Sequence, residues 1–229
     1  MINLDNSQAG FILSLLAALA TMIGWVVVAV KKNLSQYLVA LSLLVAAAAM
    51  ILLSIFELIP TANRVGLSTG SIILWLAIGV LVVVALRFLS DKLDMAGSKL
   101  EKSAILVAAA LTLHNFPEGS VAISTTMVDF QSGLVAATAL SLHNIPEGLA
   151  IAVTAVAAGM TSRKVFALVA AATIAEMLGA VVVLYESQGL SEFVIAKLLT
   201  VVAGIMFTVA ITELIPHGIA SLKSGKDKI

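Results

Sequence analysis

The chain lacks cysteine and has few charged residues. None of its 229 residues is cysteine, which excludes disulfide bonds, thiolate metal sites and thiol nucleophiles. Only 11% of the residues are charged and 61% are hydrophobic, whereas an ordinary soluble domain has about 25% charged residues. The 13 basic and 13 acidic residues balance, and no long basic run occurs, so no nucleic-acid partner is expected. This composition indicates an integral membrane protein.

Long apolar stretches fill the sequence between its few charges. A helix needs about 20 apolar residues to cross the hydrocarbon core of a bilayer, and seven stretches are long enough. The sequence therefore predicts an all-α, polytopic helical bundle in which residues 1–229 form a single membrane domain. The predicted spans, numbered 1 to 7 in chain order, are residues 9–30, 36–59, 70–89, 103–125, 132–158, 164–186 and 192–216.

Basic residues are distributed unevenly between the two sides of these spans. Arg64 falls on one side and Lys197 inside the end of span 7 on that same side, whereas the other 11 of the 13 basic residues fall on the opposite side. These 11 are Lys31, Lys32, Arg87, Lys92, Lys99, Lys102, Arg163, Lys164, Lys223, Lys226 and Lys228. Cytoplasmic loops collect Lys and Arg, so we expect a multi-pass cell-membrane protein with its N-terminus outside and its C-terminus in the cytoplasm.

Two motifs each occur twice. "LHNFPEG" at 113–119 returns as "LHNIPEG" at 142–148, and "MILLSIFELIP" at 50–60 returns as "MFTVAITELIP" at 206–216. In both cases the two copies lie on spans that run in opposite directions, and inverted repeats around a midplane site are typical of transporters. The acids of the second motif are expected at opposite mouths of a pathway, where each attracts a cation or simply reaches interfacial water. They are Glu57 and Glu213.

The first motif places ionisable groups near mid-membrane, where they are costly and mark functional sites. His114 and Glu118 are four residues apart, as are His143 and Glu147, so each pair lies on one helical face. Imidazole and carboxylate ligands suit a divalent cation such as Zn²⁺, Fe²⁺ or Mn²⁺. Glu176 adds a third carboxylate at the middle of span 6. Together these groups are sufficient for two adjacent cations.

The motif prolines and two further residues have structural consequences of their own. Pro117 and Pro146 lack the N–H group of an ordinary helical residue, so we expect each helix to bend or unwind there and to offer carbonyl oxygens as ligands. Glu176 has an alternative role as a protonated side chain bonded to a hydroxyl such as that of Thr173. His217 either helps to release metal or is a solvated residue at a helix end.

The paired "HNFPEG" and "HNIPEG", followed by "AEMLGA" on span 6, resemble the ZIP family of divalent metal transporters, particularly its short prokaryotic members. The resemblance covers roughly residues 9–217 and implies a transporter without a prosthetic group rather than an enzyme. It implies a two-metal site formed by His114, Asn115, Glu118, His143, Asn144, Glu147 and Glu176. It also implies that Met50 of span 2 lies beside this site.

The sequence departs from the family pattern in two respects. Members of the family usually have eight spans with both termini outside, whereas this sequence predicts seven. The eighth helix of the family pattern would be the counterpart of span 3. The resemblance implies that this side of the bundle is a static scaffold and that it forms a homodimer. The loop between spans 3 and 4 is rich in histidine in many members, but it has no histidine here, so a metal-sensing role for this loop is not expected.

We predict that the protein transports divalent transition-metal cations into the cytoplasm, Zn²⁺ first, with Fe²⁺, Mn²⁺, Co²⁺ and Cd²⁺ as other cargoes. No phosphate-binding loop occurs, so nucleotide hydrolysis is not expected. Enclosed carboxylates hold protons that an arriving metal must displace, which favours proton-linked transport. One alternative is an intramembrane metal-dependent hydrolase, although its usual HExxH signature is absent. The other alternative is a passive metal channel.

Overall fold

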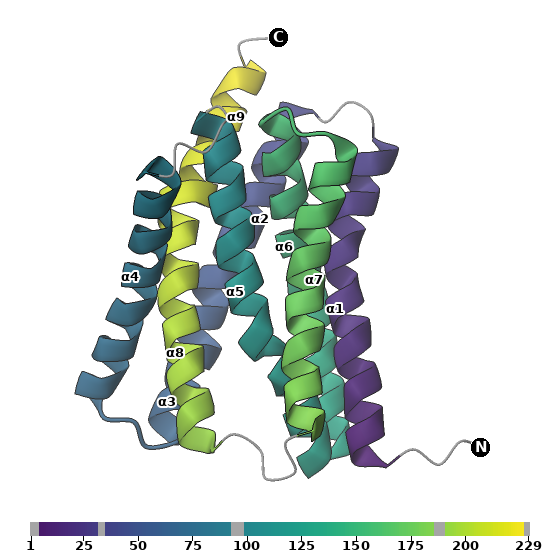
Figure 1. Ribbon diagram of the computed structural model, residues 1–229, viewed down its shortest axis with the longest axis vertical. Helices are drawn as coiled ribbons and strands as arrows, with labels where there is room; N and C mark the ends of the chain where they lie inside the picture. The colour runs from purple at the N-terminus through teal and green to yellow at the C-terminus, as the bar shows by residue number, and fades with distance from the viewer. Residues whose placement is uncertain (1–4, 32–34, 93–98, 186–190, 227–229) are drawn as a thin grey trace.

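The protein is a bundle of long helices, shown by the computed structural model in Figure 1. The structure describes residues 5–31, 35–92, 99–185 and 191–226, and no strand occurs in these ranges. The helices are α1 (Asn6–Val30), α2 (Gln36–Leu53), η1 (Ser54–Leu58), α3 (Ile59–Arg64), α4 (Thr69–Lys92), α5 (Lys99–Val128), α6 (Phe130–Ala157), α7 (Ser162–Tyr185), α8 (Glu192–Val209), η2 (Ala210–Leu214) and α9 (Ile215–Lys226). The predicted all-α membrane bundle is thus confirmed.

Among the described residues, six helical segments are long and apolar enough to cross a membrane. They correspond to predicted spans 1, 2, 3, 5, 6 and 7. The remaining span corresponds to α5, which is 30 residues long but carries the polar residues of the first motif. α1 begins at the lower end of the bundle and α9 ends at the upper end (Figure 1). The chain therefore crosses from one end of the bundle to the other an odd number of times, as the sequence predicts.

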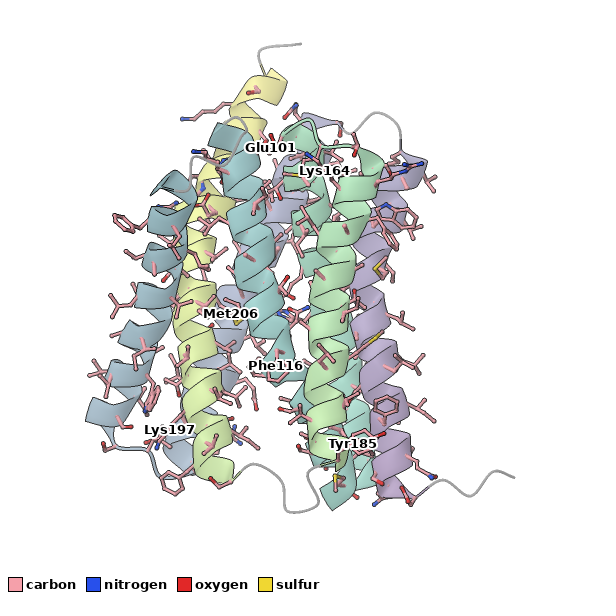
Figure 2. All side chains as sticks on the ribbon, in the orientation of Figure 1. Glu101, Phe116, Lys164, Tyr185, Lys197 and Met206 are labelled. Atoms are coloured by element: carbon pink, nitrogen blue, oxygen red, sulfur yellow. The ribbon has the colours of Figure 1, made fainter. Side chains whose placement is uncertain are left out.

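These two ends are called the N-terminal end, where α1 begins, and the C-terminal end, where α9 ends. Figure 2 shows Glu101 and Lys164 at the C-terminal end and Tyr185 and Lys197 at the N-terminal end. Lys164 and Lys197 therefore lie at the two ends where the sequence places them. Lys32 and Lys228 contribute to the predicted asymmetry but lie outside the described residues.

Packing divides the helices into two groups. α1 packs against α5, α6 and α7, and we call these four helices the motif group. The flanking group contains α2, η1, α3, α4, α8, η2 and α9, in which α4 packs on α8 and α2 packs on α9. The groups meet where α6 contacts α2 and where α5 contacts α8 and α4. In Figure 1 α5 stands between α8 on the left and α7 on the right.

Local sequence signals start several of these helices. Asp5 accepts a hydrogen bond from the backbone N–H of Gln8 at 2.8 Å before α1, and Asp129 accepts one from the backbone N–H of Ser132 at 2.8 Å before α6. Such caps satisfy backbone donors that have no partner inside the helix. Gly159 has a φ of 78°, which lets the chain turn tightly between α6 and α7. The short loops keep neighbouring helices antiparallel.

Both copies of the second motif form the same wide turn. The backbone N–H of Ile59 bonds to the carbonyl of Ser54, and that of Ile215 bonds to the carbonyl of Ala210. Each is a π-type bond over five residues, and such turns are rare and frequent at functional sites. The two turns lie near opposite ends of the bundle, because α3 lies at the N-terminal end and α9 at the C-terminal end (Figure 1). The inverted repeat predicted from the sequence is therefore also a repeat of backbone geometry.

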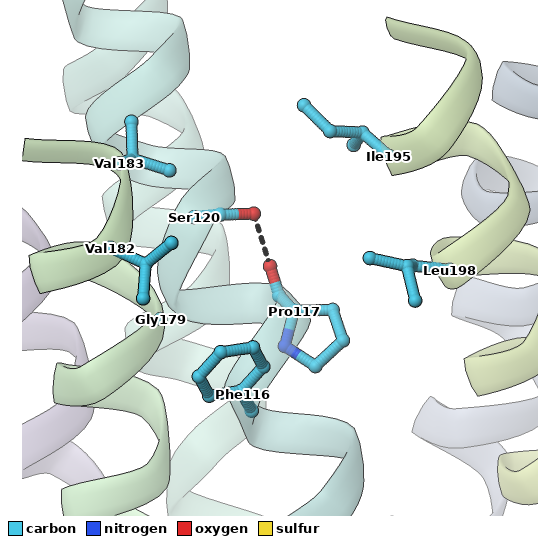
Figure 3. Close-up of a pocket in the computed structure, with 8 residues that line it drawn as sticks. All are labelled: Phe116, Pro117, Ser120, Gly179, Val182, Val183, Ile195 and Leu198. Atoms are coloured by element: carbon cyan, nitrogen blue, oxygen red, sulfur yellow. Dashed lines mark hydrogen bonds between the residues drawn. The ribbon is translucent and has the colours of Figure 1, made fainter. Parts of the chain in front are cut away.

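One part of the prediction for the prolines of the first motif is contradicted. α5 continues as an α-helix through Pro117, and α6 continues through Pro146, so the expectation of unwound backbone is wrong. A long helix that is enclosed by neighbouring helices tolerates the loss of the single backbone hydrogen bond that a proline removes. The turn after Pro117 also adjusts locally, because the hydroxyl of Ser120 donates to the Pro117 carbonyl at 2.5 Å (Figure 3).

Candidate metal centre

Four ligand side chains converge between α5 and α6. His114 and Glu118 come from α5, and His143 and Glu147 come from α6; one ligand atom from each lies within 4.8 Å of the others. The exposed fraction is 9% for His143 and 1% or less for the other three residues. The spacing of four residues works as the sequence predicts, since each helix presents its imidazole and its carboxylate to the same point.

Each carboxylate of this cluster lies between the two imidazoles. Glu147 Oε1 is 2.9 Å from His114 Nε2 and 2.8 Å from His143 Nε2. Glu118 Oε2 is 3.2 Å from His114 Nε2, and Glu118 Oε1 is 3.6 Å from His143 Nε2. The imidazole rings are nearly perpendicular at 89°, with their centroids 5.7 Å apart. All four groups therefore point toward one small volume rather than past one another.

Hydrogen bonding leaves most of this cluster unsatisfied. The contact of His114 with Glu147 has hydrogen-bond geometry, but both oxygens of Glu118 and Nε2 of His143 are buried without a hydrogen-bond partner. A buried polar atom left without a partner costs about 1–3 kcal/mol. Two imidazole nitrogens and two carboxylates are also the donors that Zn²⁺ and similar divalent cations accept. The donor set and its unmet hydrogen bonds fit a cation as the missing partner.

A second pair of polar residues adjoins this cluster. Nδ2 of Asn144 donates to both oxygens of Glu176 at 2.9 Å and to the carbonyl of Ala17 at 2.8 Å. Asn144 directly follows His143, so Glu176 is tied to the ligand cluster through neighbouring residues of α6. The suggested hydroxyl partner of Glu176 is wrong, because Thr173 donates to the carbonyl of Val169 at 3.0 Å instead.

Asn115 holds the opposite side of the cluster. With its amide oriented so that both ends are satisfied, Nδ2 donates to Glu147 Oε2 at 3.2 Å and to the carbonyl of Leu111 at 2.7 Å. This contact leaves Glu147 Oε1 directed at the two imidazoles. Asn115 thus holds Glu147 as Asn144 holds Glu176. All seven residues named from the family pattern are buried. Side-chain contacts join five of them, His114, Asn115, Glu118, His143 and Glu147, into one group, and join Asn144 and Glu176 as a pair.

The motif glycines bring two further helices against the site. A Cβ atom on Gly119 would lie 1.8 Å from the carbonyl oxygen of Glu176 on α7, and one on Gly148 would lie 1.8 Å from the carbonyl oxygen of Thr21 on α1. Gly179 of α7 and Gly24 of α1 form the other sides of these crossings. Small residues let helix backbones approach closely. The glycines of α5 and α7 therefore set how close α7, and with it Glu176, lies to α5.

Met50 is fully buried in the main hydrophobic cluster. The hydroxyl of Ser54 donates to the Met50 carbonyl at 2.8 Å and lies 3.7 Å from the sulfur of Met206, the residue equivalent to Met50 in the second repeat. Figure 2 places Met206 at mid-height on α8. These contacts describe packing, and the placement of Met50 beside the metal ligands stays a prediction.

Glu57 faces open space at the N-terminal end. Its side chain is 60% exposed and lies 3.4 Å from Arg64. It lines a cavity of about 440 Å³ together with Thr61, Ser124 and other residues of η1, α3, α5 and α8. It also lines a second cavity of about 620 Å³, which runs along the first turns of α6.

Glu213 has the opposite environment. Its side chain is only 4% exposed and forms an ion pair with Arg87 of α4, and the hydroxyl of Ser103 on α5 also donates to it. His217 lies one turn further on, where its Nδ1 is 2.7 Å from the Glu213 carbonyl oxygen. From the sequence, Arg87 is expected only as one of the basic residues of the cytoplasmic side, and Ser103 has no predicted role. Neither residue belongs to a motif, so a single sequence offers no signal for these contacts.

A small pocket lies beside the motif proline. It holds about 20 Å³ between Phe116 and Pro117 of α5, Gly179 of α7 and Ile195 of α8 (Figure 3). This volume accommodates about one water molecule. It adds no ionisable ligand to the site.

Comparison with known proteins agrees with this geometry. The family model described as ZIP Zinc transporter matches residues 89–228, which include the whole ligand cluster. The chain belongs to the ZIP family. Zinc transporter ZupT of Enterobacter sp. (strain 638) is 34% identical over 217 residues, covering 90% of this chain and 84% of that protein. Zinc transporter ZupT of Escherichia fergusonii is 36% identical over 222 residues with the same coverage.

Membership of the ZIP family confirms the resemblance inferred from "HNFPEG" and "HNIPEG". It also favours a transporter over the intramembrane hydrolase, since the family model and the relatives are described as zinc transporters. ZIP membership and the apolar helices together make the chain a multi-pass membrane protein.

Proposed function

We propose that this protein carries divalent transition-metal cations, Zn²⁺ first among them, across the cell membrane into the cytoplasm. The observation that carries the proposal is the buried group of His114, Glu118, His143 and Glu147, whose ligand atoms lie within 4.8 Å of one another. ZIP membership and relatives named as zinc transporters support it. Residues 1–229 act as one transport domain, with the basic C-terminal end of the bundle in the cytoplasm.

Two adjacent cations would use the site. One lies among the two imidazoles and the two motif carboxylates, with Glu147 able to bridge because both imidazoles approach its Oε1. The other lies toward Glu176, which Asn144 presents through two hydrogen bonds of 2.9 Å. Asn115 orients Glu147. Fe²⁺, Mn²⁺, Co²⁺ and Cd²⁺ also accept imidazole and carboxylate ligands and would compete.

Uptake into proteoliposomes tests the site. Glu147→Gln keeps the size of the side chain but removes the charge that both imidazoles face, so we expect Zn²⁺ flux to fall about tenfold or more. Glu101→Gln is the matched control, because Glu101 makes a 3.3 Å surface ion pair with Lys164 away from the site, and such pairs contribute little. Equal flux through the two variants would contradict the site assignment.

The mode of transport needs two further measurements. Saturation of the initial flux with Zn²⁺ concentration is expected for a carrier, whereas flux that rises in proportion to concentration would indicate a passive channel. A pH-sensitive dye inside the vesicles tests proton linkage, because metal binding to carboxylate and imidazole ligands releases protons. We expect the lumen to become more alkaline as Zn²⁺ enters, and an unchanged signal during active uptake would exclude proton counterflow.

A further inference from the structure

The inverted repeat extends beyond the motifs to the ends of the helices. At the offset of 29 residues that relates His114 to His143, Ser103 near the start of α5 corresponds to Ser132 near the start of α6. At the offset of 156 residues that relates the two π-turns, Glu57 corresponds to Glu213. The repeat therefore pairs a serine of the motif group with a glutamate of the flanking group at each end of the bundle.

Only one of these pairs is in contact. At the C-terminal end Ser103 donates to the buried Glu213. At the N-terminal end Ser132 and Glu57 are both exposed and line the same cavity of about 620 Å³, and the Ser132 hydroxyl donates to Asp129 at 2.8 Å instead. The serine and the glutamate are thus in contact at the C-terminal end and apart at the N-terminal end. Ser103 also lines a smaller cavity of about 250 Å³ beside His217 at the C-terminal end.

Neighbouring positions show the same difference. Leu106 of α5 is 6% exposed, whereas its equivalent on α6, Val135, is 68% exposed and lines the open cavity. Both positions carry an aliphatic residue three residues after the serine, so we attribute the difference in exposure to how the two groups of helices pack. α5 lies close against the flanking group at the C-terminal end, and α6 stands away from it at the N-terminal end.

Each glutamate also has an arginine from its own flanking group. Arg87 of α4 forms the ion pair with Glu213, and Arg64 of α3 lies 3.4 Å from Glu57. At each end the arginine and the glutamate both belong to the flanking group. The serine belongs to the motif group. At the N-terminal end the glutamate and the arginine are in place and the serine is not.

We propose that Ser132 docks on Glu57 when the N-terminal end closes, as Ser103 docks on Glu213 at the C-terminal end in this structure. A protein built from inverted repeats exposes its site to the other side when the two repeats exchange conformations, so the two serine contacts exclude each other. Ser103 and Ser132 are then positioning residues of the transport cycle. This inference rests on the transport function proposed above.

Cysteine pairs test the proposal, because the chain has no cysteine of its own. Glu213→Cys with Ser103→Cys and Glu57→Cys with Ser132→Cys are made in the full chain, reconstituted and oxidised with diamide before metal is added. A disulfide forms where the two Cα atoms come within about 7 Å. Loss of labelling by a maleimide mass tag measures the disulfide, and reduction with dithiothreitol is the control.

We expect both pairs to cross-link, because the protein visits both conformations. Each disulfide should lower Zn²⁺ flux by about tenfold or more, since conformational exchange is blocked, and dithiothreitol should restore the flux. In a chain with all four cysteines, we expect one disulfide per molecule. The proposal is overturned if the Glu57 and Ser132 pair does not cross-link under oxidation that cross-links the other pair, or if both disulfides form in one molecule.

Failure of the two proposals can be told apart. If the unmodified chain carries no Zn²⁺, the proposed function fails, but the mass-tag labelling still scores the docking contacts. If the unmodified chain carries Zn²⁺ and the cross-linked pairs carry it equally well, the transport function stands and the docking contacts are wrong.

Discussion

The crossing of α5 and α7 at Gly119 gives a direct test of how the site is built. A Cβ atom on Gly119 would lie 1.8 Å from the carbonyl oxygen and 2.7 Å from the carbonyl carbon of Glu176. Both atoms are backbone, so neither can turn away as a flexible side chain would. In Gly119→Ala the two helices must therefore separate by about 1.5 Å to restore van der Waals contact. Glu118 precedes the substituted residue, so the separation moves Glu118 and Glu176 apart.

The expected cost has two parts. Overpacking of a close helix contact destabilises a protein by about 1–3 kcal/mol, which should lower the melting temperature in detergent by a few degrees. Misplacing a functional group by about 1 Å can cost on the order of 100-fold in rate where geometry is demanding. We therefore expect Gly119→Ala to lower Zn²⁺ flux by about tenfold or more and to weaken Zn²⁺ binding measured by isothermal titration calorimetry.

Gly70→Ala is the matched control for this substitution. Gly70 lies near the start of α4, where a Cβ atom would meet nothing within 4 Å, so flux and melting temperature should stay at the level of the unmodified protein. If Gly119→Ala binds and transports Zn²⁺ as Gly70→Ala does, the close crossing does not position the site and the reasoning fails.

Substitutions at two other residues separate site geometry from stability. Asn144→Ala removes the amide that donates to both oxygens of Glu176, so calorimetry should show Zn²⁺ binding weakened by about tenfold; unchanged affinity would mean that Glu176 needs no positioning. Hydrogen bonds from the backbone N–H and then the hydroxyl of Ser132 lower the pKa of Asp129 from 3.8. The folded state therefore gains stability from Asp129 above this pKa and loses it as the pH falls through the lowered value. Asp129→Ala should melt below the unmodified protein at neutral pH, with a difference that shrinks in acid, whereas Asp129→Asn, which can still cap the helix, should show little difference at neutral pH.

Much of the ligand cluster could be predicted because its geometry is local. The i, i+4 spacing of His114 with Glu118, and of His143 with Glu147, fixes one face of each helix without knowledge of the fold. Composition likewise predicted most helical spans to within about five residues, since a membrane-spanning helix needs an apolar run of fixed minimum length. The last span is the exception, because its helix continues through α9 to Lys226, beyond the predicted end at residue 216. The antiparallel order of the two motifs was enough to predict that they meet.

The remaining contacts depend on which helices pack against each other, and local patterns in one sequence do not indicate that packing. Arg87 lies 126 residues from Glu213 along the chain, and nothing in its neighbourhood marks it as the partner of a buried acid. The hydrogen bonds of Asn144 to Glu176 join α6 to α7 in the same way. The π-turns have a sequence signal, because the repeated "ELIP" places a proline two residues after the end of each turn.

The π-turns also locate the difference between the two ends of the molecule. All four prolines of the chain belong to the repeated motifs, and the turns around Glu57 and Glu213 have the same backbone bonds over five residues. Identical local structure cannot leave one acid 60% exposed and the other 4% exposed. The difference lies in the contacts between the motif group and the flanking group, above all that of Ser103 with Glu213. It follows that substitutions within a group should change stability or metal binding, whereas substitutions at these contacts should shift the balance between the two conformations.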